Sequence, residues 1–420
     1  MYSIKRIKAR EIIDSRATPT LEVDLELTNG GFGRFSVPSG TSTGAYEALE
    51  LRDKDDQRFL GKGVLKSINY INNIIFPNLV GKYFDTQESF DSYLIGLDGS
   101  TNKSYLGANT ILALSVAFAK AVANYNSMYF FEYIGLIGGN KIYSIPQPMF
   151  NIMNGGKHAN WSTDFQEYMI IINHKEYAEV LRIACEIFLT LEKLLKAKNL
   201  SINVGNEGGF APGFTSNIEA FNFISDAVEK AGYTLGKDVF FAIDVAASEF
   251  YEKEEKIYFL KTENKKVTGE ELLDIYLNLL KHYPIISIED PFAEDDWGMW
   301  TQFHNVVGDS IHIVGDDLLV TNISRIKQAY DYKACNALLV KMNQIGTLTE
   351  TINAIKLCKE YNWYNIVSHR SGETEDVSIV HLAVGMNVDK IKAGAPSRGE
   401  RTCKYNELLR IGEIVNRKYN

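Results

Sequence analysis

Short apolar runs that each end on a charged side chain organise the second half of this chain. In order they are VFFAID, IISIE, IHIVGD, ALLVK, NIVSHR and DKIK, and they end on Asp244, Glu289, Asp316, Lys341, the pair His369 and Arg370, and Lys392. From Glu289 onward, successive ends are 27, 25, 28 and 23 residues apart. One strand, one helix and two loops take up about this length, so the spacing predicts a parallel (β/α) barrel.

The charges at the ends of these runs are candidates for function. Barrel enzymes carry their chemistry at the carboxyl ends of the strands. A single charge there is equally well explained as a solvated loop residue. Three acids followed by three basic sites, however, predict a converging cluster that suits a divalent metal and an anionic substrate.

The first 135 or so residues show a different pattern. LEVDLELTNGGFGRFSVP alternates apolar and polar residues around a glycine-rich turn, which predicts a β-hairpin. The segments ALELRD, VLKSINYINNIIFPNLV and GANTILALSVAFAKAVANY have helical patterns. KIYSIPQPM, near residues 140 to 148, marks a crossover. We therefore predict a smaller α+β domain over residues 1–138, followed by an α/β domain with a (β/α)8-type barrel over residues 139–420.

Several further elements are expected in the second domain. MIII and SINV are predicted as early strands, with EVLRIACEIFLTLEKLLKAK as the amphipathic helix between them. Residues 249–266 are rich in charge and predict an excursion with a short strand pair. EELLDIYLNLLKHY is then the next helix.

Composition narrows the functional class. The 420 residues are 45% apolar and 23% charged, as in ordinary globular proteins. A net charge of −9 argues against nonspecific nucleic-acid binding. The four cysteines form no CxxC pair, and neither a signal peptide nor a long apolar run is found, so we expect reduced thiols, no membrane span and a cytoplasmic location.

Asp244, Glu289 and Asp316 end three consecutive runs and are the candidate metal ligands. Hard cations such as Mg²⁺ prefer carboxylate oxygen. Without a cation, three converging carboxylates would repel one another. The alternative is three unrelated loop acids, or a helix N-cap in the case of Asp316.

Lys341 closes the apolar run ALLVK and is expected at the floor of the cleft. Burial, a metal ion and Lys392 would lower its pKa toward neutrality, as a general base requires. In the alternative, Lys341 pairs with one of the acids, which would raise its pKa.

Two glycine-rich loops carry further candidates. VGNEGGFAPG surrounds Glu207 with glycines that allow close backbone approach, although a plain tight turn would have the same pattern. NGGKHAN brings His158, and the nearby segment FQEYM brings Gln166 and Glu167. These groups are expected at the mouth of an early strand.

Anion-binding groups follow in SHRSGETED and in the first domain. Arg370 and Ser371, beside His369, form a suitable phosphate grip. VPSGTSTGAYE is interpreted either as a flexible linker or as a lid over a charged ligand. No Walker A, GxGxxG or HExxH motif occurs, which argues against nucleotide-binding and zinc-protease functions.

Taken together, these segments resemble the enolase family over nearly the full length of the chain. The strings that carry the resemblance occur in the expected order: REIIDSR, VPSGTSTGAYEALELRD, GNEGGFAP, SIEDPFAEDDW, VGDDLLVTN, VKMNQIGTLTE, SHRSGETED and KYNELLRI. The resemblance implies the interconversion of 2-phosphoglycerate with phosphoenolpyruvate and water, in glycolysis, with two Mg²⁺ ions per site.

The resemblance also implies roles for individual residues. Lys341 would be the base, and Glu207 the acid, supported by Glu167 and His158. Asp244, Glu289 and Asp316 would bind the first Mg²⁺, and Ser42 the second. Gln166, His369, Arg370, Ser371 and Lys392 would contact the substrate. A homo-oligomer, either a dimer or an octamer, is also implied.

Several positions depart from the family pattern. Ala17-Thr18 replaces Gly-Asn, Thr41 replaces Ala, Asn206 replaces Asp, Val377 and His381 replace Thr and Asp, and Gly399 replaces Ser. None of these removes a residue with an implied catalytic role. They leave open a relative that acts on another carboxylate or phosphonate, or a paralogue that binds a macromolecular partner.

Overall fold

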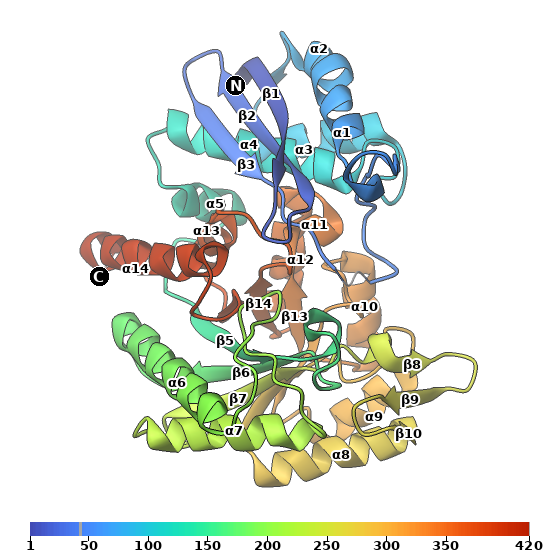
Figure 1. Cartoon of the computed structure of the whole chain (residues 1–420). Helices are drawn as coiled ribbons and strands as arrows, with labels where there is room; N and C mark the ends of the chain where they lie inside the picture. Colours follow the sequence, from blue (N-terminus) through green and yellow to red (C-terminus); the bar gives the residue numbers. More distant parts are fainter. Residues whose placement is uncertain (42–43, 420) are drawn as a thin grey trace.

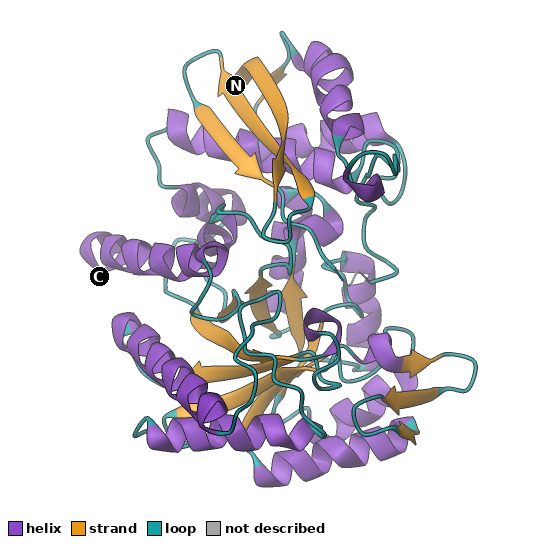
Figure 2. Cartoon of the chain, viewed as in Figure 1, coloured by secondary structure: helices purple, strands orange, loops and turns teal. Residues whose placement is uncertain are grey.

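The amino-terminal part of the chain is an antiparallel sheet packed against helices (Figures 1 and 2). We describe residues 1–41 and 44–419 in a computed structural model. The sheet has the strand order β3-β2-β1-β4. Its elements are β1 (Tyr2–Ile13), β2 (Pro19–Leu27), β3 (Phe32–Ser36), α1 (Leu65–Tyr70), a π-helical turn (Ile71–Ile75), α2 (Phe76–Leu79), β4 (Tyr83–Phe84), α3 (Gln87–Asp98), α4 (Ala108–Tyr125) and α5 (Phe130–Gly138).

The hairpin of β2 and β3 is confirmed, and its glycines have specific uses. Burial alternates along β2, which turns Leu21, Val23 and Leu25 toward α4 and the core. Gly30 has φ 103°, a conformation that favours glycine in the turn. A Cβ on Gly33 would lie 2.0 Å from the carbonyl oxygen of Ala117, so the missing side chain allows β3 to pack closely on α4.

The rest of the chain forms a closed barrel with the strand order β11-β12-β13-β14-β15-β5-β6-β7. The strands that end in candidate residues are β7 (Val239–Asp244), β11 (Ile285–Glu289), β12 (His312–Gly315), β13 (Ala337–Val340), β14 (Tyr364–Ser368) and β15 (Lys390–Lys392). The other elements are β5 (Gln147–Asn154), β6 (Glu167–Ile172), α6 (Tyr177–Ala197), α7 (Asn217–Lys230), β8 (Tyr251–Glu252), β9 (Ile257–Leu260), β10 (Lys265–Val267), α8 (Gly269–His282), α9 (Trp297–Val307), α10 (Ile323–Tyr332), α11 (Met342–Ile345), α12 (Leu348–Glu360), α13 (Ser378–Gly385) and α14 (Gly399–Tyr419).

The expectation of a purely parallel barrel was wrong for one strand. β6 pairs antiparallel with both β5 and β7, whereas the other neighbouring strands pair in parallel. The connection from β5 to β6 contains only a short 3₁₀ turn, Gly156–Ala159, and without a crossover helix the chain simply reverses. The reversal places Glu167, the first residue of β6, opposite Asn154 and Asp244, which end β5 and β7.

Three local predictions were also wrong. SINV is an exposed loop in which only Val204 makes an isolated bridge, to Phe210, because nothing covers its apolar side chains. ALELRD is extended, since the amides of Ala48 and Leu49 donate to the carbonyls of Gln344 and Asn102 at 2.8 and 2.9 Å instead of to a helical turn. The charged excursion pairs three short strands in the order β10-β9-β8, not two.

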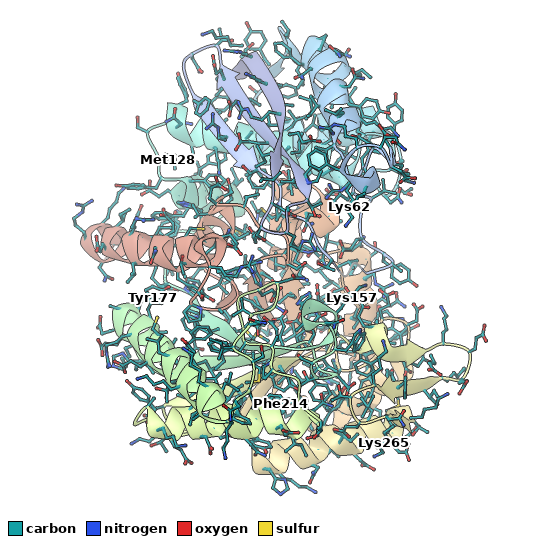
Figure 3. The ribbon with its side chains drawn as sticks, viewed as in Figure 1. Lys62, Met128, Lys157, Tyr177, Phe214 and Lys265 are labelled. Carbon is teal, nitrogen blue, oxygen red and sulfur yellow. The ribbon has the colours of Figure 1, made fainter. Side chains whose placement is uncertain are left out.

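The two parts of the chain meet at the barrel rim. In Figure 3, Lys62 lies in the amino-terminal part, Lys157 near the barrel rim and Lys265 on the outlying sheet of β8–β10. Among the described residues, no helix combines the length and the apolar character that a bilayer crossing requires.

Candidate active site

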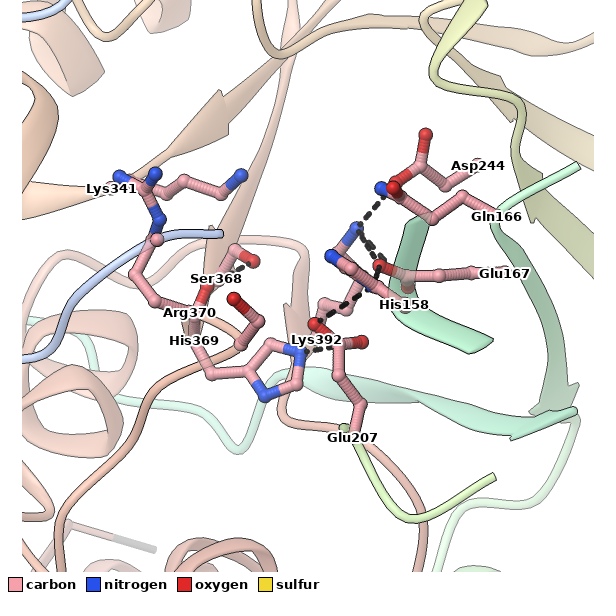
Figure 4. A pocket seen from close by; sticks show the side chains of 12 residues that line it. His158, Gln166, Glu167, Glu207, Asp244, Lys341, Ser368, His369, Arg370 and Lys392 are labelled. Atoms are coloured by element: carbon pink, nitrogen blue, oxygen red, sulfur yellow. Dashed lines mark hydrogen bonds and ion pairs between the residues drawn. The ribbon is translucent and has the colours of Figure 1, made fainter. Parts of the chain in front are cut away.

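A pocket opens at the rim where the barrel strands end, and it gathers most of the predicted site (Figure 4). About 270 Å³ of space, part of it open to solvent, lies between the protein atoms here. The pocket is lined by Gly40, His158, Gln166, Glu167, Glu207, Asp244, Lys341, Ser368, His369, Arg370, Ser371 and Lys392. Glu289 and Asp316 contact its two lysines, and Ser42 lies outside the described residues.

Lys392 is the cation at the centre of the predicted acidic cluster. Its Nζ lies 2.8 and 2.9 Å from the two carboxylate oxygens of Glu289, 3.3 Å from Glu167 and 3.6 Å from Asp244. Burial favours the neutral amine, but the surrounding carboxylates outweigh it and raise the pKa of Lys392 well above its usual value. The side chain therefore stays an ammonium.

The predicted metal ligands suit a hard divalent cation by their donor chemistry. Asp244, Glu289 and Asp316 are buried and supply only carboxylate oxygen. Burial raises the pKa of Glu289 well above its usual value, and the charges of Asp244 and Asp316 raise it further, so added positive charge would relieve this repulsion.

The tightest groups of possible metal ligands differ from the predicted set. Among the described residues, ligand atoms lie within 4.8 Å of one another in two groups: His158, Glu167 and Glu207, and Asp290, Asp316 and Asp317. The predicted ligands form ion pairs with lysines instead: Glu289 and Asp244 with Lys392, and Asp316 with Lys341. The site thus contains carboxylate and histidine groups that could hold a metal ion.

We predict that Lys392→Met destabilises the protein by about 3–5 kcal/mol, the usual cost of leaving a buried charge without its partner. Mg²⁺ is expected to recover part of this loss, because it can neutralise the same carboxylates. Thermal melts with and without Mg²⁺ measure both effects without any substrate.

Lys390→Met is the matched control. Lys390 lies on the same strand, and its Nζ donates to the neutral Oε1 of Gln147 at 3.0 Å. The loss there is expected near 1 kcal/mol, with no added response to Mg²⁺. Equal losses and equal Mg²⁺ responses in the two variants would contradict a cation site at Asp244, Glu289 and Asp316.

Lys341 forms an ion pair with Asp316, whose other oxygen accepts a 2.8 Å hydrogen bond from Gln344. The expected lowering of the lysine pKa was wrong for this state. Burial lowers the pKa, but the nearby carboxylates, Asp316 first and then Glu289, together outweigh it, and the pKa of Lys341 is raised. The structure instead has the alternative expected from the sequence, in which Lys341 pairs with an acid, here Asp316.

Glu167 and Glu207 are buried acids whose pKa values are shifted in opposite directions. Burial and the charge of Glu207 raise the pKa of Glu167 well above its usual value. Burial also opposes ionisation of Glu207, but His369 and His158 outweigh it and hold the pKa of Glu207 well below its usual value. His158 Nδ1 lies 3.5 Å from Glu207 and 3.8 Å from Glu167.

The predicted anion grip joins the barrel to the amino-terminal part. Arg370 donates to Glu47 at 3.1 Å and to Asn343 at 2.9 Å. The hydroxyl of Ser371 accepts from the amide of Thr41 at 2.9 Å and from Arg16 at 3.1 Å. Thr41 and Glu47, which lie on either side of residues 42–43, thus both contact the loop that follows β14.

Three structural residues of the site were missed from the sequence. Asp290 accepts the amides of Asp316 and Asp317 at 2.9 and 2.8 Å, and so supports the end of β12. The sequence offered a signal for two of the three residues: Asp290 directly follows Glu289, and Glu47 lies within the predicted lid segment VPSGTSTGAYE. Arg401, buried in α14, has no comparable signal, because it lies far from any strand end.

Comparison with known families agrees with this geometry. The model described as "Enolase, N-terminal domain" matches residues 4–134, and the one described as "Enolase, C-terminal TIM barrel domain" matches residues 142–420. The chain belongs to the enolase family. Membership supports a lyase of the enolase superfamily that acts on a small anionic substrate.

Two departures from the enolase pattern have visible consequences. Ala17, which replaces a glycine, has φ 55°, in the left-handed region that disfavours a side chain. Asn206, which replaces an acid, lines a cavity beside the site together with Arg16, Thr18 and Thr41. The loss of a negative charge at residue 206 leaves this cavity more basic than the family pattern would.

Proposed function

We propose that this enolase interconverts 2-phospho-D-glycerate with phosphoenolpyruvate and water. The observation that carries the proposal is the placement of Lys341 on one side of the pocket and the Glu167–Glu207 pair on the other (Figure 4). Removal of a proton from C2 and departure of hydroxide from C3 need a base and an acid facing different atoms of one small substrate.

Lys341 is the base in this proposal. Its neutral amine takes the C2 proton, so its ion pair with Asp316 has to separate before the transfer. A lysine or histidine base with one or two Mg²⁺ ions is general to enolase-superfamily sites, so this part of the proposal is not peculiar to this chain.

The Glu167–Glu207 pair supplies the acid. It holds one proton between two buried carboxyl groups, with the proton on Glu167 before substrate binds. That proton passes to Glu207 and from Glu207 to the C3 hydroxyl, which leaves as water; His158 contacts both carboxyl groups. Burial keeps bulk water from exchanging the proton.

Substrate binding and charge neutralisation come from the cations of the pocket. Arg370 and Ser371 bind the phosphate, while Gln166, His369 and Lys392 bind near the carboxylate. Asp244, Glu289 and Asp316 would hold one Mg²⁺ and Ser42 a second. When bound, these ions supply positive charge where the second negative charge of the carbanion develops.

The test of this function is an absorbance assay for phosphoenolpyruvate with 2-phosphoglycerate as substrate. Activity is expected with Mg²⁺ and is expected to vanish in excess chelator, because the lysine and arginine side chains alone do not offset the developing charge. Restored Mg²⁺ should restore the rate. Undetectable turnover at saturating Mg²⁺, with metal still bound, would instead favour a partner-binding role, and turnover of another carboxylate alone would favour a different substrate.

The proposal also includes the role, location and oligomeric state that the family resemblance implies. A glycolytic role in the cytoplasm and assembly into a dimer or octamer follow from the resemblance. Light scattering decides the oligomeric state.

A further inference from the structure

Arg401 connects the two loops that carry the acid and the anion grip. Its guanidinium is fully buried in α14. One terminal nitrogen donates to the carbonyl of Arg370 at 2.7 Å, and the other donates to the carbonyls of Ser371 and Asn206 at 2.7 and 3.0 Å. The residues before Glu207 and after His369 are therefore held by one side chain.

The same guanidinium also contacts the imidazole of His369. The first terminal nitrogen lies 2.5 Å from Nδ1 of His369. A guanidinium offers five N–H donors, has no acceptor and does not lose its proton in proteins. The histidine nitrogen that faces it, Nδ1, is therefore the acceptor.

An accepting nitrogen on one side of a neutral imidazole requires a proton on the other side. Burial, with Arg401, lowers the pKa of His369 to about 4, so the ring is neutral near pH 7. Its Nε2 lies 3.3 Å from Oε2 of Glu207, an oxygen that also accepts from Asn151 at 2.9 Å. Figure 4 shows the ring of His369 directed at this carboxyl group.

Gly394 shows how closely these groups approach. A Cβ at residue 394 would lie 2.7 Å from the carbonyl of Glu207, 2.9 Å from Cδ of Arg401 and 3.1 Å from Cε1 of His369. Gly394 also has φ 85°, in the left-handed region. The backbone therefore leaves room for this arrangement and for no side chain.

We propose that Arg401 is a positioning residue that fixes the proton of His369 on the nitrogen facing Glu207. The N–H directed at Glu207 stabilises its carboxylate. The opposite tautomer would direct a lone pair at a carboxylate and repel it. The expected effect on catalysis rests on the function proposed above. The assignment of the His369 tautomer does not depend on that function.

The test is ¹⁵N NMR of the histidine-labelled full-length protein near pH 7.5, with the His369 signals identified by their loss in His369→Gln. The Nε2–H tautomer is expected in the wild type. In Arg401→Gln, whose amide oxygen can accept a hydrogen bond, the Nδ1–H tautomer is expected to become populated. The turnover number kcat should fall roughly 10- to 100-fold, as when an orienting partner of a functional histidine is lost.

Arg398→Gln is the matched control. Arg398 directly precedes α14 and donates to Glu400 at 2.6 Å and to the carbonyl of Ser15 at 3.2 Å. Because neither bond involves His369, the loss of Arg398 should leave the tautomer of His369 unchanged. A wild-type His369 that is Nδ1–H or doubly protonated overturns the proposal, and this holds even where Arg401→Gln fails to fold. An unchanged tautomer in a folded Arg401→Gln overturns it as well. Absent turnover of 2-phosphoglycerate with the expected tautomer contradicts the proposed function alone.

Discussion

In the Lys341→Ala variant, formation of phosphoenolpyruvate is expected to fall by roughly 10²- to 10⁴-fold, the usual contribution of a general base. Exchange of the C2 proton of 2-phosphoglycerate with deuterated solvent should fall by a similar factor, because both reactions begin with the same proton transfer. Absorbance follows the first reaction and proton NMR of the substrate follows the second.

Lys327→Ala serves as the control for this variant. Lys327 is an exposed lysine on α10, so its removal alters the charge of the protein without touching the pocket. Both rates should match the wild type. Wild-type exchange in Lys341→Ala would reject Lys341 as the base, whatever happened to dehydration.

Glu207→Gln is expected to separate the two steps of the reaction. Dehydration should fall by roughly 10²- to 10⁴-fold because the amide cannot protonate the departing hydroxyl. Exchange at C2 should persist, since Lys341 lies across the pocket and keeps its surroundings. The ratio of exchange to dehydration, measured in one sample, is the deciding quantity.

Glu167→Gln completes this comparison. The substitution removes the carboxyl group that holds the proton before substrate binds, so dehydration should fall while exchange again persists. Equal losses of exchange and dehydration in both variants would show that the pair supports the base or the substrate, and is not the acid.

The positions of the strands could be predicted from the sequence because each buried strand is a short apolar run with a charged end. Asp244 and Glu289 end β7 and β11 as expected, and Lys341 directly follows β13. The direction of β6 could not be predicted, because an apolar run such as MIII looks the same in either direction. The deciding feature, a connection without a crossover helix, is a property of the loop.

Protonation was less predictable than position. The pKa of Lys341 depends on which neighbour comes nearest, and pattern alone does not say that Asp316 approaches more closely than Lys392. Likewise, Glu167 and Glu207 are similar acids in sequence, and only their different partners divide the proton between them. Arg401 was missed because its effect operates through backbone carbonyls and one ring nitrogen.

The ion pair between Arg370 and Glu47 has a consequence for expressing the barrel without the amino-terminal part of the chain. Glu47 precedes the barrel by about a hundred residues, yet it holds the guanidinium that the barrel contributes to ligand recognition. A barrel expressed without its leading segment would retain the strand ends and the hydrogen bond from Arg370 to Asn343, but Arg370 would lose its carboxylate partner. The contact between the two parts of the chain therefore passes through the proposed anion-binding residues, and the proposed activity requires both parts.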